Sequence, residues 1–171
     1  MAKLAFNETI RNISQPFLLP IVKILDSWGI HPNTVTITCL MGFLISSIFI
    51  AYGKLLLGGI FLLLFAPLDA IDGLLARYSK KVTSFGAFLD STLDRYGEIF
   101  LFLAFTYYFL NQNSIYGVIL SFLAITGSLM VSYTRARAEG VGFDCKIGLL
   151  TRFERIFLLI VALIFDLCIP L

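Results

Sequence analysis

The chain has 171 residues, of which 58% are hydrophobic and 15% aromatic, and its mean hydropathy is +0.91. A soluble globular domain is only roughly half apolar. The composition therefore excludes an ordinary soluble domain and predicts an all-α integral membrane protein. The net charge of +2 says little about binding partners, because the charges are distributed asymmetrically along the chain. We expect no nucleic acid among the partners.

The N-terminal segment, residues 1–32, is predicted to contain an amphipathic helix. Apolar side chains recur there at helical spacing beside Lys23 and Asp26: Phe17, Leu18, Ile21, Val22, Leu25 and Trp28. This pattern is typical of a helix that lies in the membrane interface.

Five later stretches are long enough to cross a bilayer, since a span needs about 20 mostly apolar residues. We place them near Thr34–Tyr52, Leu55–Tyr78, Ser84–Leu110, Ser114–Ala138 and Leu149–Leu171. The connections are short and no internal repeat is present. One domain is therefore expected over residues 1–171, in which a transmembrane helix bundle over 33–171 follows the interfacial helix.

Basic residues predict the orientation, because short cytoplasmic loops carry the excess of Lys and Arg. With the N-terminus inside, only Lys54 of the thirteen basic residues falls outside, and Arg95 lies within the third span. The remaining eleven lie on or near the cytoplasmic side. This topology also brings the end of the second span and the start of the third to that side.

Four aspartates occupy the ends of these two apolar spans: Asp69, Asp72, Asp90 and Asp94. An ionised carboxylate at the centre of a membrane helix costs about 2.5–3.5 kcal/mol, so positive charge should lie among them. The i,i+3 and i,i+4 spacings put each pair on one helix face. Oxygen ligands of this kind suit Mg²⁺ or Mn²⁺.

Small residues accompany the carboxylates. Gly73 and Ala76 continue the face of the first pair, and Gly86 lies one turn before Asp90. They would let membrane helices pack closely, or let a ligand approach the backbone beside the metals.

The combined pattern is Asp69-x2-Asp72-Gly73-x2-Ala76-Arg77-x8-Gly86-x3-Asp90-x3-Asp94, which specifies eight residues over 26 positions. It resembles the signature of the CDP-alcohol phosphotransferase family at each defined position. The similarity extends to HPNTVT before the first span and to SYTRARAEG and KIGLLTRFER later in the chain.

The resemblance implies a transferase that breaks the pyrophosphate of a CDP-linked lipid, joins the phosphatidyl group to an acceptor hydroxyl and releases CMP. It implies two divalent ions, Mg²⁺ or Mn²⁺, bound by the four aspartates, with Asp94 also the general base. Contacts with the CDP moiety are implied for Gly73, Ala76, Arg77, Asn33 and Thr36; the last two are also ordinary residues for a helix start.

Basic residues gather at the cytoplasmic ends of the fourth and fifth spans: Arg135, Arg137, Lys146, Arg152 and Arg155. They fit positive-inside flanking and contact with anionic lipid. They also fit a pocket for an acceptor phosphate, since Arg152 and Arg155 share one helix face at i,i+3. Glu98, one turn after Asp94, could pair with a cation or order the metal ligands.

The basic segment resembles phosphatidylinositol-phosphate and archaetidylinositol-phosphate synthases, although Phe153 stands where proline is usual. The resemblance implies an inositol phosphate acceptor, with glycerol 3-phosphate as the alternative. It also implies six spans where five are recognised, and a homodimer. We expect the enzyme in the plasma membrane, with its active site on the cytoplasmic side where the basic residues gather.

A cation transporter or proton-coupled carrier would also explain aspartates within membrane helices. Such a path normally lies near the bilayer midplane at a repeat interface. Here the aspartates lie towards one end beside basic residues, which favours the enzyme.

Overall fold

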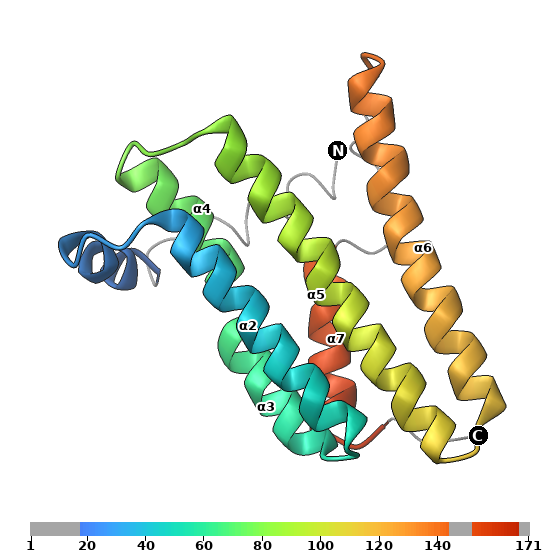
Figure 1. The fold of residues 1–171 in the computed structure, drawn as a ribbon. Coiled ribbons are helices and arrows are strands. Elements are labelled where there is room, and N and C mark those ends of the chain that lie inside the picture. The colour runs from blue at the N-terminus through green and yellow to red at the C-terminus, as the bar shows by residue number, and fades with distance from the viewer. Residues whose placement is uncertain (1–17, 144–151, 168–171) are drawn as a thin grey trace. The chain divides into compact units, whose positions relative to one another are not determined.

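The computed structural model describes residues 18–143 and 152–167, and every regular element within those ranges is helical (Figure 1). Residues 18–27 form the first described helix. The others are α2 (Pro32–Ala51), α3 (Leu55–Phe65), α4 (Leu68–Tyr78), α5 (Ser84–Asn111), α6 (Ile115–Gly140) and α7 (Arg152–Ile164). The all-α architecture predicted from composition is confirmed.

The described residues form two compact units. The first unit comprises residues 18–39 and 67–93, and the second comprises residues 40–66, 94–143 and 152–167. Helices α2 and α5 each contribute residues to both units. The single domain expected over residues 1–171 stays a prediction.

The core of the first unit joins the helix of residues 18–27 to α2 and α4. Its buried side chains are Val22, Val35, Ile71 and Leu75, with Leu18, Leu25, Ile30, Leu68 and Leu74 packed against them. The helix of residues 18–27 therefore has two apolar faces. One packs on the core, while the other leaves Ile21 and Ile24 exposed, and Trp28 in the turn after the helix is exposed as well. Exposed apolar side chains of this kind suit a helix in the membrane interface.

The stretch predicted as one long helix, Leu55–Tyr78, is divided into α3 and α4 at Ala66 and Pro67. Proline has no backbone N–H to donate to the preceding turn, and its ring crowds that turn. The interruption makes Asp69 part of the first turn of α4. A carboxylate is favoured there by the positive end of the helix dipole.

Close helix contacts organise the second unit. A Cβ atom added to Gly59 on α3 would lie 2.9 Å from the Cβ atom of Leu163 on α7, and one added to Gly97 on α5 would lie 2.9 Å from the Phe43 ring on α2. The Ser46 hydroxyl on α2 also donates a 2.7 Å hydrogen bond to the Gly58 carbonyl on α3. Such small residues let membrane helices approach each other closely.

Three segments of the described chain are long and apolar enough to cross a membrane: Pro32–Ala51, Leu55–Tyr78 and Ile115–Gly140. Helix α6 leaves large apolar side chains exposed along its length, including Ile119, Phe122 and Leu123. An exposed apolar surface of this kind suits contact with lipid.

The other two predicted spans differ from these three. Helix α5 has 28 residues, but it contains charged side chains at Asp90, Asp94, Arg95 and Glu98. Helix α7 ends at Ile164 after 13 residues, which at 1.5 Å per residue is about 20 Å and less than a bilayer core. The span count of five stays a prediction.

Candidate active site

The carboxylates of Asp69 on α4 and Asp90 on α5 meet within the first unit. Each offers an oxygen atom, and the two oxygens lie within 4.8 Å of each other. Both side chains are partly buried, so a cation between them would relieve the repulsion of two negative charges. Ligands that are all oxygen fit Mg²⁺ or Mn²⁺ better than zinc or copper.

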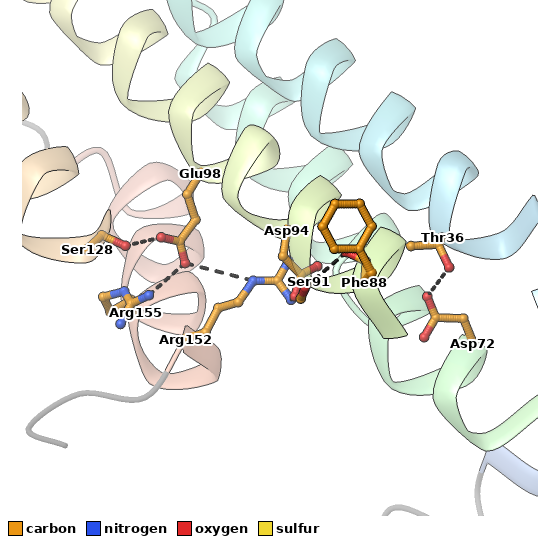
Figure 2. Close-up of polar contacts among 9 residues, drawn as sticks. All are labelled: Thr36, Asp72, Phe88, Ser91, Asp94, Glu98, Ser128, Arg152 and Arg155. Atoms are coloured by element: carbon orange, nitrogen blue, oxygen red, sulfur yellow. Dashed lines mark hydrogen bonds and ion pairs between the residues drawn. The ribbon is translucent and has the colours of Figure 1, made fainter. Parts of the chain in front are cut away.

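Asp72 lies one turn after Asp69 on α4 and is buried, with 5% of its surface exposed. The hydroxyl of Thr36 on α2 donates a 2.7 Å hydrogen bond to Asp72 Oδ2, as Figure 2 shows. The same hydroxyl lies 3.2 Å from the Pro32 carbonyl oxygen. Thr36, predicted to contact CDP, thus has a carboxylate partner that its spacing in the sequence did not indicate.

The other residues predicted to contact CDP also lie in the first unit. Gly73, Ala76 and Arg77 follow Asp72 along α4, and Asn33 lies in the first turn of α2. Among the described residues, a Cβ atom added to Gly73 would meet only the Arg77 guanidinium, at 3.6 and 3.7 Å. Since that is an ordinary contact, helix packing does not require glycine at position 73, which favours the ligand explanation of this glycine over the packing one.

Gly86, in the first turn of α5, differs from Gly73. A Cβ atom there would lie 3.1 Å from Thr83 Oγ1 and 3.3 Å from Asn33 Oδ1. The Gly86 amide also donates a 3.0 Å hydrogen bond to Thr83 Oγ1. Close packing within the protein is therefore enough to explain this second motif glycine.

Asp94 follows Asp90 by one turn of α5 and belongs to the second unit. Arg152 Nη1, at the start of α7, lies 2.7 Å from Asp94 Oδ2. The two side chains are 24% and 18% exposed, so this ion pair is better protected from solvent than a surface pair. The carboxylate predicted as the general base and an arginine predicted to bind the acceptor phosphate are direct partners.

Glu98, one further turn along α5, binds the second arginine. Arg155 Nη2 donates a 2.8 Å hydrogen bond to Glu98 Oε1, and Arg152 Nε lies 3.8 Å from the same oxygen. The hydroxyl of Ser128 on α6 donates to Glu98 Oε2 (Figure 2). Of the two roles considered for Glu98, pairing with a cation is the one that the structure bears out.

The remaining basic residues have different surroundings. Arg135 on α6 pairs with Glu139 one turn later, Nε to Oε1 at 3.1 Å, and both side chains are more than half exposed. Arg137 is exposed near the end of α6. Lys146 lies outside the described residues. Among the described basic residues of this cluster, Arg152 and Arg155 are the two that contact partly buried or buried carboxylates on α5.

Ser128 is the residue of this network that sequence reasoning missed. A serine in a membrane helix commonly bonds a carbonyl of its own helix, as Ser121 does with Gly117 at 2.8 Å. Nothing in the local sequence distinguishes the two serines. The bond to Glu98 depends on which helix α6 packs against.

The two units offer complementary chemistry. The first has carboxylate oxygens close enough to share a cation, next to a helix face where Gly73 leaves room for a ligand. The second has two guanidinium groups held by Asp94 and Glu98. Divalent cations and arginines are both groups that proteins use to bind phosphate.

Comparison with known proteins agrees with this chemistry. The CDP-alcohol phosphatidyltransferase family model matches residues 29–169. An archaetidylinositol phosphate synthase of Pyrococcus horikoshii is 39% identical over 155 residues, which is 90% of this chain and 79% of the relative. The corresponding synthase of Methanothermobacter thermautotrophicus is 34% identical over 158 residues, which is 90% of this chain and 77% of the relative.

Solved structures of the Mycobacterium tuberculosis phosphatidylinositol phosphate synthase share the fold. The structure with CDP-DAG bound has a TM-score of 0.80 and 28% identity, covering 86% of this chain and 75% of that one. A structure in complex with manganese and citrate has a TM-score of 0.76, covering 85% and 70%. The chain is an integral membrane protein and belongs to the CDP-alcohol phosphatidyltransferase family.

Proposed function

We propose that this protein transfers the phosphatidyl group, or its archaeal ether-lipid counterpart, from a CDP-linked lipid to a hydroxyl of inositol phosphate and releases CMP. Membership of a transferase family favours this activity over that of a cation carrier. The similarity to inositol phosphate synthases supports the choice of acceptor.

The observation that carries the proposal is the 2.7 Å ion pair between Arg152 and Asp94. A phosphorylated polyol carries its reacting hydroxyl and its phosphate on one small molecule. An acceptor whose hydroxyl reaches Asp94 therefore brings its phosphate close to Arg152, and Arg155 lies one turn further along α7. A neutral acceptor would form no charge-assisted contact with either guanidinium.

The cofactor proposed is a pair of divalent ions, Mg²⁺ or Mn²⁺, held by Asp69, Asp72, Asp90 and Asp94. Support comes from the 4.8 Å approach of carboxylate oxygens in the first unit and from the manganese in the related structure. When bound, such ions would polarise the phosphoryl group and stabilise the charge on the leaving CMP.

The chain's own residues would bind the CDP moiety, orient the acceptor and remove the proton from its hydroxyl. Gly73, Ala76 and Arg77 would lie along the CDP moiety, with Asn33 and Thr36 near the nucleotide. Arg152 and Arg155 would hold the acceptor phosphate, with Arg135, Arg137 and Lys146 adding positive charge. The acceptor oxygen forms a bond to the lipid-bearing phosphorus, the bond from that phosphorus to the CMP oxygen breaks, and Asp94 takes the hydroxyl proton.

The decisive experiment measures CMP release from a CDP-lipid by purified protein with Mg²⁺ or Mn²⁺. The acceptors are inositol 1-phosphate, glycerol 3-phosphate, free inositol, serine and choline. We expect inositol 1-phosphate to be preferred. Preference for glycerol 3-phosphate would keep the phosphate pocket and change the product, whereas preference for a neutral acceptor would overturn the pocket.

We further propose a homodimer in the plasma membrane with the active site on the cytoplasmic side. The side rests on the distribution of Lys and Arg along the chain. The orientation can be tested by introducing a cysteine at Lys54 or at Lys80 and treating intact cells with a membrane-impermeant thiol reagent. Only the cysteine at position 54 should react. Mass measurement of the detergent-solubilised protein tests the dimer.

A further inference from the structure

Among the described residues of the second unit, Glu98 is the most deeply buried carboxylate, with 4% of its surface exposed. A charge removed from water in this way is stable only when paired and hydrogen-bonded. Its two oxygens have different partners: Oε1 accepts from Arg155, and Oε2 accepts from Ser128. The orientation of this carboxylate is thus defined from α7 on one side and α6 on the other.

The position of Glu98 relative to the arginines is what a phosphate pocket needs. Two guanidinium groups at i,i+3 repel each other when they converge on one point. Glu98 Oε1 lies 2.8 Å from Arg155 Nη2 and 3.8 Å from Arg152 Nε, so its charge offsets that repulsion. A guanidinium has five N–H donors, so an arginine can keep a carboxylate partner and still bind a phosphate.

Ser128 provides an independent indication that the arrangement is built for orientation. Ser121 and Ser128 lie on α6 and are both 5% exposed. The Ser121 hydroxyl bonds the Gly117 carbonyl of its own helix, whereas the Ser128 hydroxyl donates to Glu98. The arginines alone would be enough to balance the charge of Glu98. The hydrogen bond from Ser128 adds a second fixed partner and so restricts rotation of the Glu98 carboxylate group.

We propose that Glu98 is a positioning residue for the acceptor phosphate: held by Ser128, its carboxylate orients the guanidinium groups of Arg155 and Arg152 before the acceptor binds. The inference rests on the proposed function and adds to it a residue that acts on phosphate affinity through the two arginines. Orientation in advance improves binding because less side-chain freedom is lost when the ligand arrives.

The test uses the full-length protein in detergent or lipid, with the KM for inositol 1-phosphate, the KM for CDP-lipid and kcat measured separately. Removal of the Glu98 charge by itself favours an anionic ligand, so a higher acceptor KM in Glu98→Gln would report the loss of orientation. We expect a rise of about 10–100-fold, the range known for partners that orient metal ligands. The KM for CDP-lipid should change little. Glu98→Asp keeps the charge and should recover part of the acceptor affinity.

Ser128→Ala and Ser121→Ala form a matched pair that keeps the test decisive if Glu98→Gln does not fold. Both remove a hydroxyl from equally buried positions on α6, but only Ser128→Ala should raise the acceptor KM. Equal effects of the two serine variants, or a parallel rise of both KM values in a folded Glu98→Gln variant, would overturn the inference.

The wild-type acceptor panel separates the two proposals. If the wild type prefers inositol 1-phosphate and Ser128→Ala behaves like Ser121→Ala, the role of Glu98 fails and the proposed function stands. If the wild type prefers a neutral acceptor, both fail.

Discussion

The Thr36 hydroxyl on α2 donates a 2.7 Å hydrogen bond to the carboxylate of Asp72 on α4, and both side chains are buried. The bond occupies Oδ2 of Asp72 and leaves the carboxylate in one orientation. Partners of this kind usually tune a metal ligand and contribute about 10–100-fold to metal affinity.

Thr36→Val keeps the shape of the side chain and removes the hydroxyl, so we expect weaker Mn²⁺ binding by about 10–100-fold. The Mn²⁺ affinity is measured by titration, with free Mn²⁺ followed by its electron paramagnetic resonance signal. Thr38→Val is the matched control, because the Thr38 hydroxyl bonds only Thr34 of the same helix in the described contacts. If Thr36→Val raises the KM for CDP-lipid at saturating metal and leaves Mn²⁺ affinity unchanged, Thr36 contacts the nucleotide instead.

Gly73→Ala should leave the protein folded and impair its use of the CDP-lipid. Within the part of the chain that the structure describes, the added methyl group would meet only Arg77, at 3.6 Å or more. The thermal midpoint should therefore stay close to that of the wild type while the KM for CDP-lipid rises. Gly97→Ala is the contrasting variant, because its methyl group would lie 2.9 Å from the Phe43 ring and should lower the midpoint. Normal kinetics of Gly73→Ala would show that no ligand approaches this glycine.

Asp94→Asn should reduce turnover by about 10²–10⁴-fold, the usual contribution of a general base. The amide keeps an oxygen that can accept from Arg152, so the pocket should persist. Turnover is measured at saturating Mn²⁺, with CDP-lipid binding measured in parallel. Near-normal turnover with metal bound would place the base elsewhere.

Arg152→Gln should act in opposite directions on two ligands. The acceptor KM should rise, because a charge-assisted contact with phosphate is worth roughly 1.5–3 kcal/mol. Mn²⁺ affinity should increase, because a positive charge 2.7 Å from Asp94 Oδ2 is removed and repulsion of the cation falls. A misfolded variant would lose both affinities, so tighter Mn²⁺ binding distinguishes the local effect.

Removal of divalent ions by a chelator should abolish CMP release, and Mg²⁺ or Mn²⁺ should restore it. Anomalous scattering from crystals grown with Mn²⁺ and CDP-lipid should reveal two ions among the four aspartates. Density at another site with these carboxylates empty would contradict the proposed metal ligands, and a single ion would correct the stoichiometry.

Local patterns in the sequence were enough to predict the helical architecture and to group the four aspartates on shared helix faces. Apolar runs of about 20 residues specify membrane helices because backbone groups in lipid must bond within their own segment. The i,i+3 and i,i+4 spacings of the aspartates specify shared faces, since a helix repeats every 3.6 residues. Pro67 also indicates the interruption between α3 and α4, but the continuous hydrophobic pattern over Leu55–Tyr78 predicted a single helix.

Contacts between helices were decided only by the tertiary structure. The spacing of Arg152 and Arg155 predicted a shared face, but not that Asp94 and Glu98 would be their partners, because those residues lie more than fifty positions earlier. The local sequence does not distinguish Ser121 from Ser128. Their hydroxyls differ in partner, because Ser121 bonds a carbonyl of α6 itself whereas Ser128 bonds Glu98 on α5. The bond from Thr36 to Asp72 likewise depends on the packing of α2 against α4. Helical periodicity determines which side chains point the same way, whereas packing between helices determines what they touch.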